Sequence, residues 1–313
     1  MSKIGKILLT GFILLLCGGI IFVICLAFSG WDIRFLSNVT AQEIEYTEPP
    51  ESQLTNITID YENTDILVYT QDAPTVRIVY PQSFYKNGEK ATEVTITETE
   101  NTLKITEKSI NGWQFWNFTA PKTKLYLPAD RTYTLTLSTN NGNVTLDGTA
   151  YSVNAISLTT DNGNIHTKKA ITAQGKVNAE TNNGNITLQE VSAQNITAET
   201  DNGNVRLYTG VATEQIRLET NNGNVTITKS GTANTVHLSS DNGNIEVDGV
   251  TAESITFETD VGNVEGTVIG KKSDFTITVE HNLGETDLYP QTGGAKTLHV
   301  ETDIGNIEVN FTE

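Results

Sequence analysis

The chain has 313 residues, and its 37% hydrophobic and 19% charged side chains accompany an abundance of Thr, Asn, Gly, Val and Ile that is typical of β-rich proteins. Its formal net charge of -18 repels phosphate backbones, so we expect no nucleic-acid partner. The only cysteines, Cys17 and Cys25, lie in one apolar run. This excludes a disulfide framework and a cysteine-based metal site from the rest of the chain.

The first element along the chain is suited to crossing a membrane. Residues 7–28 carry no charge, and at about 1.5 Å per residue a helix of this length spans the roughly 30 Å hydrocarbon core. Lys3 and Lys6 precede this stretch. The positive-inside rule therefore places residues 1–6 in the cytoplasm and the C-terminal region outside, which predicts a single-pass cell-membrane protein.

A cleaved signal peptide is the alternative to this anchor. Ala27 and Ser29 form a small-x-small pattern before Gly30, as a cleavage site requires. The apolar run, however, exceeds the roughly 7–15 residues of a signal-peptide core, so we expect a retained anchor.

Two regions are predicted between the helix and the repeats. Residues 29–53 are acidic, contain Pro49-Pro50 and show little apolar periodicity, which predicts an extended extracellular spacer. Residues 54–130 read as alternating strands separated by turn signals. We interpret them as an irregular β region that either continues the repeat structure irregularly or caps its first unit.

Residues 131–313 contain a short internal repeat. Units such as TNNGNV and TDNGNI recur nine times at spacings of 19 to 22 residues. Their glycines are Gly142, Gly163, Gly184, Gly203, Gly223, Gly243, Gly262, Gly284 and Gly305. An aliphatic residue stands seven positions before every glycine and, except in the degenerate copy HNLGET, two positions after it. This pattern predicts short strands with one face turned inward.

A unit of about 20 residues cannot bury an apolar face alone, but stacked units share one interior. We therefore predict an all-β fold: a β-solenoid of about nine rungs of 19–22 residues, with an N-terminal β cap region, preceded by one transmembrane helix. The last rung, which ends near Glu313, has no obvious cap. Its open edge would need charge, twist or another subunit to protect it, so a homo-oligomer is allowed.

The corners of the rungs carry a predicted side-chain ladder. Asn-Gly supplies positive φ at a turn, and the asparagine that follows can stack on its equivalents and exchange amide hydrogen bonds. The predicted ladder consists of Asn143, Asn164, Asn185, Asn204, Asn224, Asn244, Asn263 and Asn306, and Glu285 is expected to interrupt it. Two positions before glycine, Asn and Asp alternate over the first six rungs, which keeps carboxylates about two rungs apart.

The sequence offers no catalytic machinery, so we expect no enzyme activity and no cofactor. It contains no nucleophile or phosphate-binding motif, and its four histidines show no metal-ligand spacing. We expect neither catalytic nor metal-binding residues. Two rows of carboxylates leave open a calcium site or, more simply, a solvated acidic ridge. These rows are Asp161, Asp201, Asp241, Asp260 and Asp303, and Glu180, Glu199, Glu219, Glu258, Glu280 and Glu301.

An aromatic cluster stands out within residues 110–118. It contains Trp113, Phe115, Trp116 and Phe118. These side chains are either a binding patch for a sugar or membrane surface or an apolar plug that closes the first rung, and we favour the plug.

The repeat resembles a bacterial extracytoplasmic domain of unknown function that is labelled "putative adhesin" and is found in toast-rack-like and envelope-stress proteins. The residues that carry the resemblance are ETDNGNV at 199–205, ETNNGNV at 219–225, TLKITE at 102–107 and the run from 124 to 144. It covers about residues 54–313. The resemblance implies a β-solenoid with a binding or scaffold role and supplies no catalytic residues.

We therefore expect a non-catalytic, envelope-anchored extracytoplasmic module that binds or scaffolds. Cell-wall polymer, envelope proteins or further copies of the chain are its expected partners. A sensor or decoy that captures cationic antimicrobial peptides through the acidic ridges is the first alternative, and a polysaccharide-active enzyme is the second.

Overall fold

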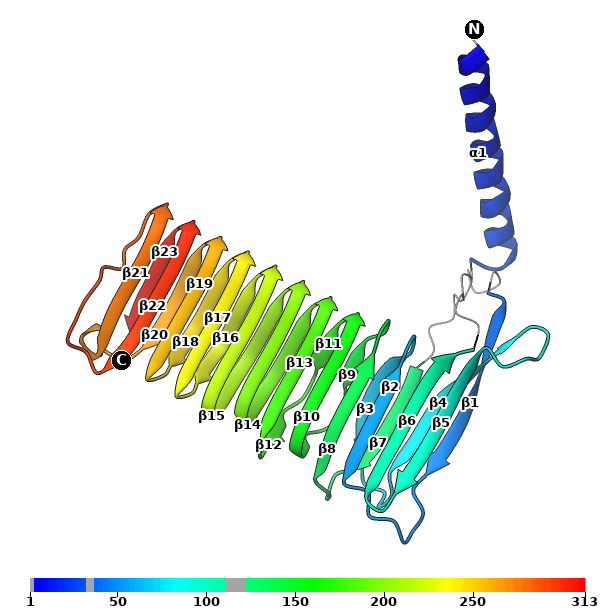
Figure 1. The fold of residues 1–313 in the computed structure, drawn as a ribbon, viewed down its shortest axis with the longest axis horizontal. Coiled ribbons are helices and arrows are strands. Elements are labelled where there is room, and N and C mark those ends of the chain that lie inside the picture. The colour runs from blue at the N-terminus through cyan, green and yellow to red at the C-terminus, as the bar shows by residue number, and fades with distance from the viewer. Residues whose placement is uncertain (1–2, 32–36, 111–121, 313) are drawn as a thin grey trace.

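The computed structural model describes residues 3–31, 37–110 and 122–312, which form one helix followed by a single 23-stranded sheet wound into a rod (Figure 1). The helix is α1 (Lys3–Phe28), and its Gly11–Phe28 segment is long and apolar enough to cross a membrane. The strands of the N-terminal region are β1 (Val39–Thr47), β2 (Asn56–Tyr61), β3 (Asp65–Gln71), β4 (Arg77–Tyr85), β5 (Thr92–Thr99), β6 (Thr102–Ser109) and β7 (Lys122–Pro128).

The repeat region contributes the remaining strands and one short 3-10 helix. They are β8 (Tyr133–Thr139), β9 (Val144–Leu146), β10 (Tyr151–Asn162), β11 (Ile165–Thr167), β12 (Ile171–Ala173), β13 (Lys176–Asn183), β14 (Ile186–Asn202), β15 (Val205–Asn222), β16 (Val225–Thr232), β17 (Thr235–Asn242), β18 (Ile245–Thr251), β19 (Ser254–Val261), β20 (Val264–Ile269), η2 (Lys272–Asp274), β21 (Phe275–Leu283), β22 (Lys296–Ile304) and β23 (Ile307–Thr312).

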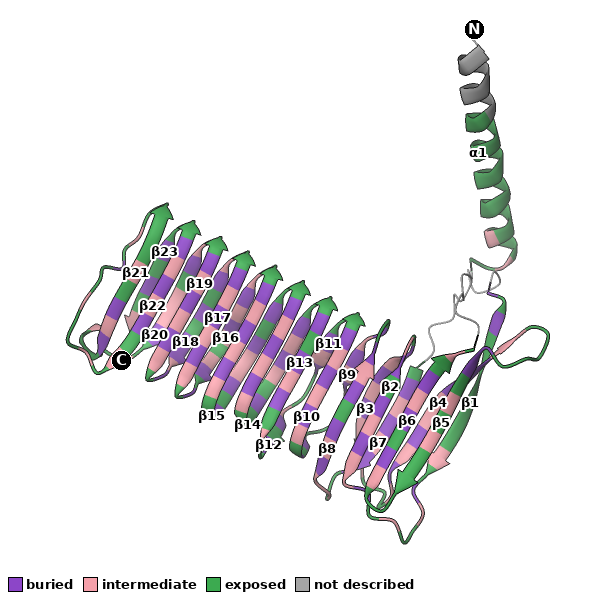
Figure 2. Ribbon diagram, in the orientation of Figure 1, coloured by how far each residue is buried: buried purple, intermediate pink, exposed green. Residues whose placement is uncertain are grey.

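The predicted aliphatic columns form the interior of the rod, and the β-solenoid prediction is confirmed. In the column seven positions before glycine, Ile156 pairs with Val177 and Val177 with Ile196, in parallel register. The column two positions after glycine is buried from Val144 to Ile307. Buried and outward positions alternate along the stacked strands of the repeat region, as Figure 2 shows. Because identical positions stack directly, every rung extends the same core by one layer.

The order of rungs departs from chain order at both ends of the rod. At the C-terminal end, β22 pairs with β19 on one side and with β21 on the other. The rung with Gly305 therefore lies inside the rung with Gly284. At the other end, β2 lies between β6 and β8, and β3 lies between β7 and β9. The prediction that the chain's last rung ends the rod is wrong, because the β21 rung covers it (Figure 1).

Antiparallel strands close the N-terminal end. β4 pairs with β1 and with β7, and β5 pairs with β6. Part of the predicted spacer is thus a strand: Val39–Thr47 forms the nine-residue β1. Its side chains are mostly exposed, and the strand is held by backbone pairing to β4. The apolar periodicity that identifies buried strands is therefore missing from this edge strand.

A buried ion pair joins this cap to the first rungs. The Glu48 side chain, only 1% exposed, accepts hydrogen bonds from the Arg131 guanidinium and from the backbone N–H groups of Leu54 at 2.9 Å and Val76 at 2.8 Å. Burial opposes ionisation of Glu48, but the hydrogen bonds from Arg131 and the two amides outweigh it and lower its pKa. Glu48 therefore links three separate segments of the cap.

Candidate functional site

The corner asparagines form a continuous hydrogen-bonded ladder along the rod. The backbone N–H and side-chain amide of Asn164 both donate to Oδ1 of Asn143, at 2.9 and 3.1 Å. The backbone part of this pattern continues through every predicted member to Asn306. Asp65 begins the ladder by accepting from Asn143, and Glu285 ends it by donating its N–H to Asn306. Glu285 was expected to interrupt the ladder, but the exchanged rung order places it at the end.

The corner glycines are required mainly for close stacking. A Cβ on Gly163 would lie 1.9 Å from the carbonyl oxygen of Gly142, and one on Gly184 would lie 1.8 Å from that of Gly163. Only Gly203, Gly223 and Gly284 among the nine have φ in the positive range that disfavours side chains. Positive φ was expected at most of these corners, and that expectation is wrong.

A buried hydroxyl column, missed in the sequence reasoning, satisfies the corner carbonyls. Thr160 Oγ1 donates to the carbonyl oxygen of Gly142 at 2.8 Å, and the equivalent residue of each later rung in the main stack does the same. These residues are Thr160, Thr181, Thr200, Thr220, Ser240, Thr259 and Thr302. The Thr or Ser that begins each of these TNNGNV-like units was the feature of the sequence from which this column could have been predicted.

The residues just before the glycines form an exposed polar ridge. A second asparagine ladder runs there, in which Asn162 donates to Asn141 and Asn183 to Asn162, each at 3.0 Å. In the alternating Asn and Asp column, Asn221 donates to Asp201 at 3.2 Å. The central rod therefore presents an ordered row of amides and carboxylates to solvent.

The strand face before the corner carries an acidic groove, lined chiefly by Glu180, Glu199, Glu219 and Asp201. The three glutamates are direct register partners on successive rungs. Arg217 lies beside them and forms ion pairs with Glu199 at 3.4 Å and Glu219 at 2.6 Å. The groove retains an excess of negative charge.

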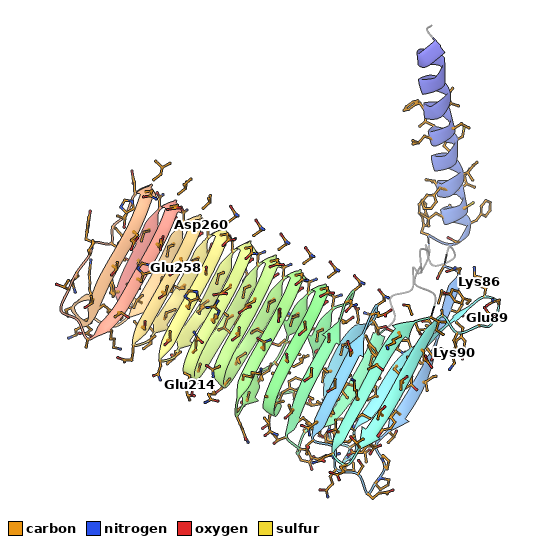
Figure 3. All side chains as sticks on the ribbon, viewed as in Figure 1. Lys86, Glu89, Lys90, Glu214, Glu258 and Asp260 are labelled. Carbon is orange, nitrogen blue, oxygen red and sulfur yellow. The ribbon has the colours of Figure 1, made fainter. Side chains whose placement is uncertain are left out.

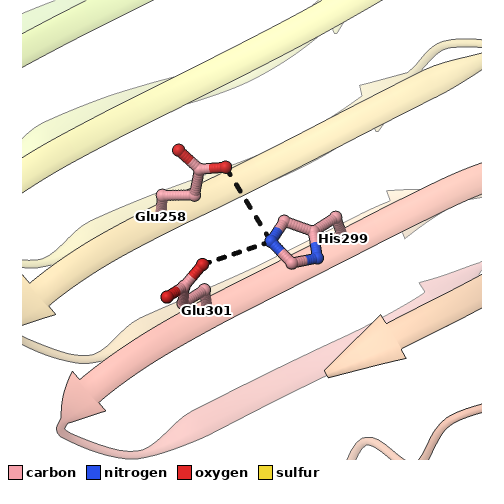
Figure 4. A group of neighbouring side chains, drawn as sticks. All are labelled: Glu258, His299 and Glu301. Atoms are coloured by element: carbon pink, nitrogen blue, oxygen red, sulfur yellow. Dashed lines mark hydrogen bonds and ion pairs between the residues drawn. The ribbon is translucent and has the colours of Figure 1, made fainter. Parts of the chain in front are cut away.

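Two histidines occupy the same column of this face but meet different partners. His237 Nε2 lies 2.9 Å from Glu219, whose other oxygen is bound by Arg217. Burial opposes ionisation of Glu219, but His237 and Arg217 outweigh it and lower its pKa. His299 instead faces two carboxylates, those of Glu301 and Glu258 (Figure 4).

The C-terminal rungs differ from the central rungs in their outward columns. Asp241, Asp260 and Asp303 stack without intervening asparagine, and Glu258, Glu301 and Glu280 follow one another in the neighbouring column. The exposed asparagine ladder gives way to Val261, Ile304 and Leu283, of which Leu283 is 66% exposed. Figure 3 shows Asp260 at the corner edge and Glu258 on the same strand.

The predicted aromatic patch of Trp113, Phe115, Trp116 and Phe118 lies outside the described residues. Its two interpretations, binding patch and plug, both stay predictions.

The Toastrack DUF4097 family model matches residues 54–310. The chain belongs to this family. The comparison with curated proteins finds no match. Among solved structures, the Toastrack chain is similar to a "putative adhesin" from Bacteroides fragilis, with 18% identity, 86% of this chain and 97% of that chain covered, and a TM-score of 0.44.

Two further solved structures are similar to the Toastrack chain. A "putative adhesin" from Parabacteroides merdae has 13% identity, with 87% of this chain and 96% of that chain covered, and a TM-score of 0.49. A "putative lipid binding protein" from Parabacteroides distasonis has 16% identity, with 88% of this chain and 97% of that chain covered, and a TM-score of 0.44.

Proposed function

We propose that this Toastrack chain is a non-catalytic binding module of the adhesin type, held at the cell membrane by α1 with its rod outside the cytoplasm. The observation that carries this proposal is the in-register repetition of outward polar side chains, which turns the rod into a linear array of equivalent contacts. An array suits a long or repetitive ligand, because each weak contact adds to the next by raising the effective concentration. Cell-wall polymer and envelope proteins are ligands of this kind.

The membrane placement rests on the charge pattern around the helix. Lys3 and Lys6 precede the apolar stretch, and Arg34 is the one basic residue that follows it closely in the sequence. This arrangement supports a cytoplasmic N-terminus. Protease protection in membrane vesicles tests it, because an outward rod is digested from the outside while a tag at the N-terminus is not.

Retention on purified cell wall tests the binding role. The full chain in detergent micelles is mixed with insoluble wall at low and high salt, beside a Trp113→Ala plus Trp116→Ala variant and a Trp31→Ala control. Binding that survives salt and is lost only in the double variant supports an adhesive module that uses the aromatic residues. If the chain does not bind at low or at high salt, wall polymer is excluded as the ligand, and envelope proteins remain as the proposed partners.

The acidic groove favours a second candidate function, the capture of cationic peptides. Glu180, Glu199, Glu219 and Asp201 line it, and Arg217 is the basic group paired with two of them. Such a field attracts extended basic ligands, and salt screens it over about 8 Å at physiological ionic strength.

A charge-matched pair of variants tests peptide capture. Glu180→Gln with Asp201→Asn removes two charges from the groove. The second substitution introduces the asparagine that the neighbouring rungs carry at the equivalent position. Glu246→Gln with Asp248→Asn removes two charges from β18, on the strand after the corner. Peptide affinity that falls about tenfold with the first pair only, and with added salt, supports the groove. Equal losses in both pairs attribute binding to net charge alone.

A further inference from the structure

The cluster of Glu258, His299 and Glu301 brings three metal-ligating groups together near the C-terminal end of the rod. His299 Nε2 lies 3.3 Å from Glu301 Oε2 and 3.8 Å from Glu258 Oε1, and one donor atom from each residue lies within 4.8 Å of the other two (Figure 4). We propose that these residues bind a divalent transition-metal ion of the Zn²⁺ type.

The donor distances suit a tetrahedral ion. With metal–ligand bonds of about 2.0–2.1 Å, tetrahedral donors lie about 3.3–3.4 Å apart. The donor atoms of His299 and Glu301 already have this separation. The donors of all three residues lie within 4.8 Å of one another, so a rotation of the flexible Glu258 carboxylate can bring its oxygen to tetrahedral distance from both partners. An imidazole nitrogen with two carboxylates favours Zn²⁺ over Ca²⁺ or Mg²⁺, which prefer oxygen ligands throughout.

The side chains are also accessible. The exposed fractions are 28% for His299, 39% for Glu258 and 43% for Glu301, so an ion can enter and water can fill the fourth position. Glu280, the register partner of Glu301 on β21, is exposed on the outer side and adds negative charge to the site.

The rung of His237 provides a natural contrast within the same columns. There Arg217 already neutralises Glu219, and Ser239 stands where the other site has Glu301. At the His299 site the positions equivalent to Arg217 are taken by uncharged Thr256 and Thr278. The carboxylates beside His299 are therefore available to a metal ion. The Glu219 carboxylate beside His237 is instead neutralised by the Arg217 guanidinium.

The site also has a structural consequence. Glu258 belongs to β19 and the other two residues to β22, which is the strand that lies out of chain order. A bound ion would fasten this inserted rung to the preceding one. Binding to the folded state alone would raise the unfolding temperature as free metal increases.

The test uses the full chain, free of any polyhistidine tag, in detergent micelles. Co²⁺ and Zn²⁺ are titrated separately, with visible absorption for Co²⁺ and calorimetry for Zn²⁺. The variants are His299→Ala and the shape-conserving Glu301→Gln, and the matched control is His237→Ala. Circular dichroism without metal establishes that each variant is folded.

We expect the wild type and His237→Ala to bind one Zn²⁺ per chain and to show visible Co²⁺ absorption. Affinity should fall at least tenfold in His299→Ala and in Glu301→Gln, and the Zn²⁺-dependent rise in unfolding temperature should disappear. Unchanged affinity in the two site variants, or no binding by the wild type, overturns the proposal.

Discussion

The middle of the rod and its two ends follow different rules. Between the rungs of Gly142 and Gly243, chain neighbours are spatial neighbours and the same polar side chains recur. At each end a rung lies out of chain order, and the outward chemistry changes. The difference teaches that repetition provides stacking, whereas the ends require separate devices to protect exposed backbone and are free to carry other groups.

We predict the largest loss of stability for Gly184→Ala, a substitution in the repetitive middle of the rod. The added Cβ would stand 1.8 Å from the carbonyl oxygen of Gly163, so two rungs must separate. We expect a loss of more than about 4 kcal/mol in the free energy of unfolding. Urea denaturation of the full chain, followed by circular dichroism, measures it.

Gly88→Ala is the control for that variant. Gly88 has a φ of +88°, but nothing lies within 4 Å of an added Cβ, so the expected cost is about 1 kcal/mol of backbone strain. Similar losses in the two variants would show that the stacked rungs accommodate the added Cβ and that close stacking does not require glycine at this corner.

Glu48→Gln tests the N-terminal cap. It leaves the Arg131 guanidinium beside a neutral amide in a buried site, and we expect a loss of about 3 kcal/mol. Glu51→Gln, at an exposed position three residues away, should change stability by less than about 0.5 kcal/mol. The urea midpoints of the two variants are compared. Equal midpoints would show that Glu48 does not stabilise the cap.

The stability from Glu48 should also depend on pH. Its pKa is lowered in the folded protein, so its contribution is fully present above the ordinary carboxyl value of about 4.3 and is lost as pH falls through the folded pKa. The stability gap between wild type and Glu48→Gln should therefore narrow as pH drops below about 4. A gap that stays constant down to pH 2 would contradict the assigned pKa shift.

Asn224→Ala tests a ladder residue in the middle of the rod. The Asn224 side chain accepts the backbone N–H of Asn244 at 2.8 Å, so its removal leaves that donor without its partner. We expect a loss of about 1–2 kcal/mol. Asn221→Ala, three residues earlier on the exposed ridge, removes a hydrogen bond to Asp201 and should cost less than about 0.5 kcal/mol. Calorimetry compares the unfolding temperatures of the two variants. A larger loss in Asn221→Ala would show that the hydrogen bonds of the exposed ridge contribute more stability than those of the corner ladder.

Asp260→Asn should give the smallest effect and the opposite sign. It restores at the C-terminal end the Asn and Asp alternation of the middle, because Asp260 stacks between Asp241 and Asp303. The unfolding temperature should rise by about 1 °C at low salt and the gain should vanish at about 1 M salt, where the Debye length is about 3 Å. A loss of stability at low salt would mean that the stacked carboxylates do not repel one another.

The solenoid and its ladder were predictable from sequence because each rung contacts chiefly its neighbours. The period-two aliphatic pattern and the repeated Asn-Gly corner specify one rung, and direct stacking extends it. The repeat pattern was less informative where a rung lacks the usual corner residues. An irregular continuation of the solenoid was one expectation for residues 54–130, but the rung of β2 and β3 could not be located individually, because Thr64 and Asp65 replace the usual glycine and asparagine at its corner.

The amino-acid sequence by itself thus determined the inward columns, the polar corner and the apolar helix, all of which are local patterns. Only the tertiary structure decided that β1 joins the sheet, that β22 lies inside β21, and that Glu258 meets His299. The physical reason is that strands pair through backbone groups that every residue carries. Any rung with the right inward columns can stack on any other, so the choice of neighbour at the rod's ends depends on the whole chain.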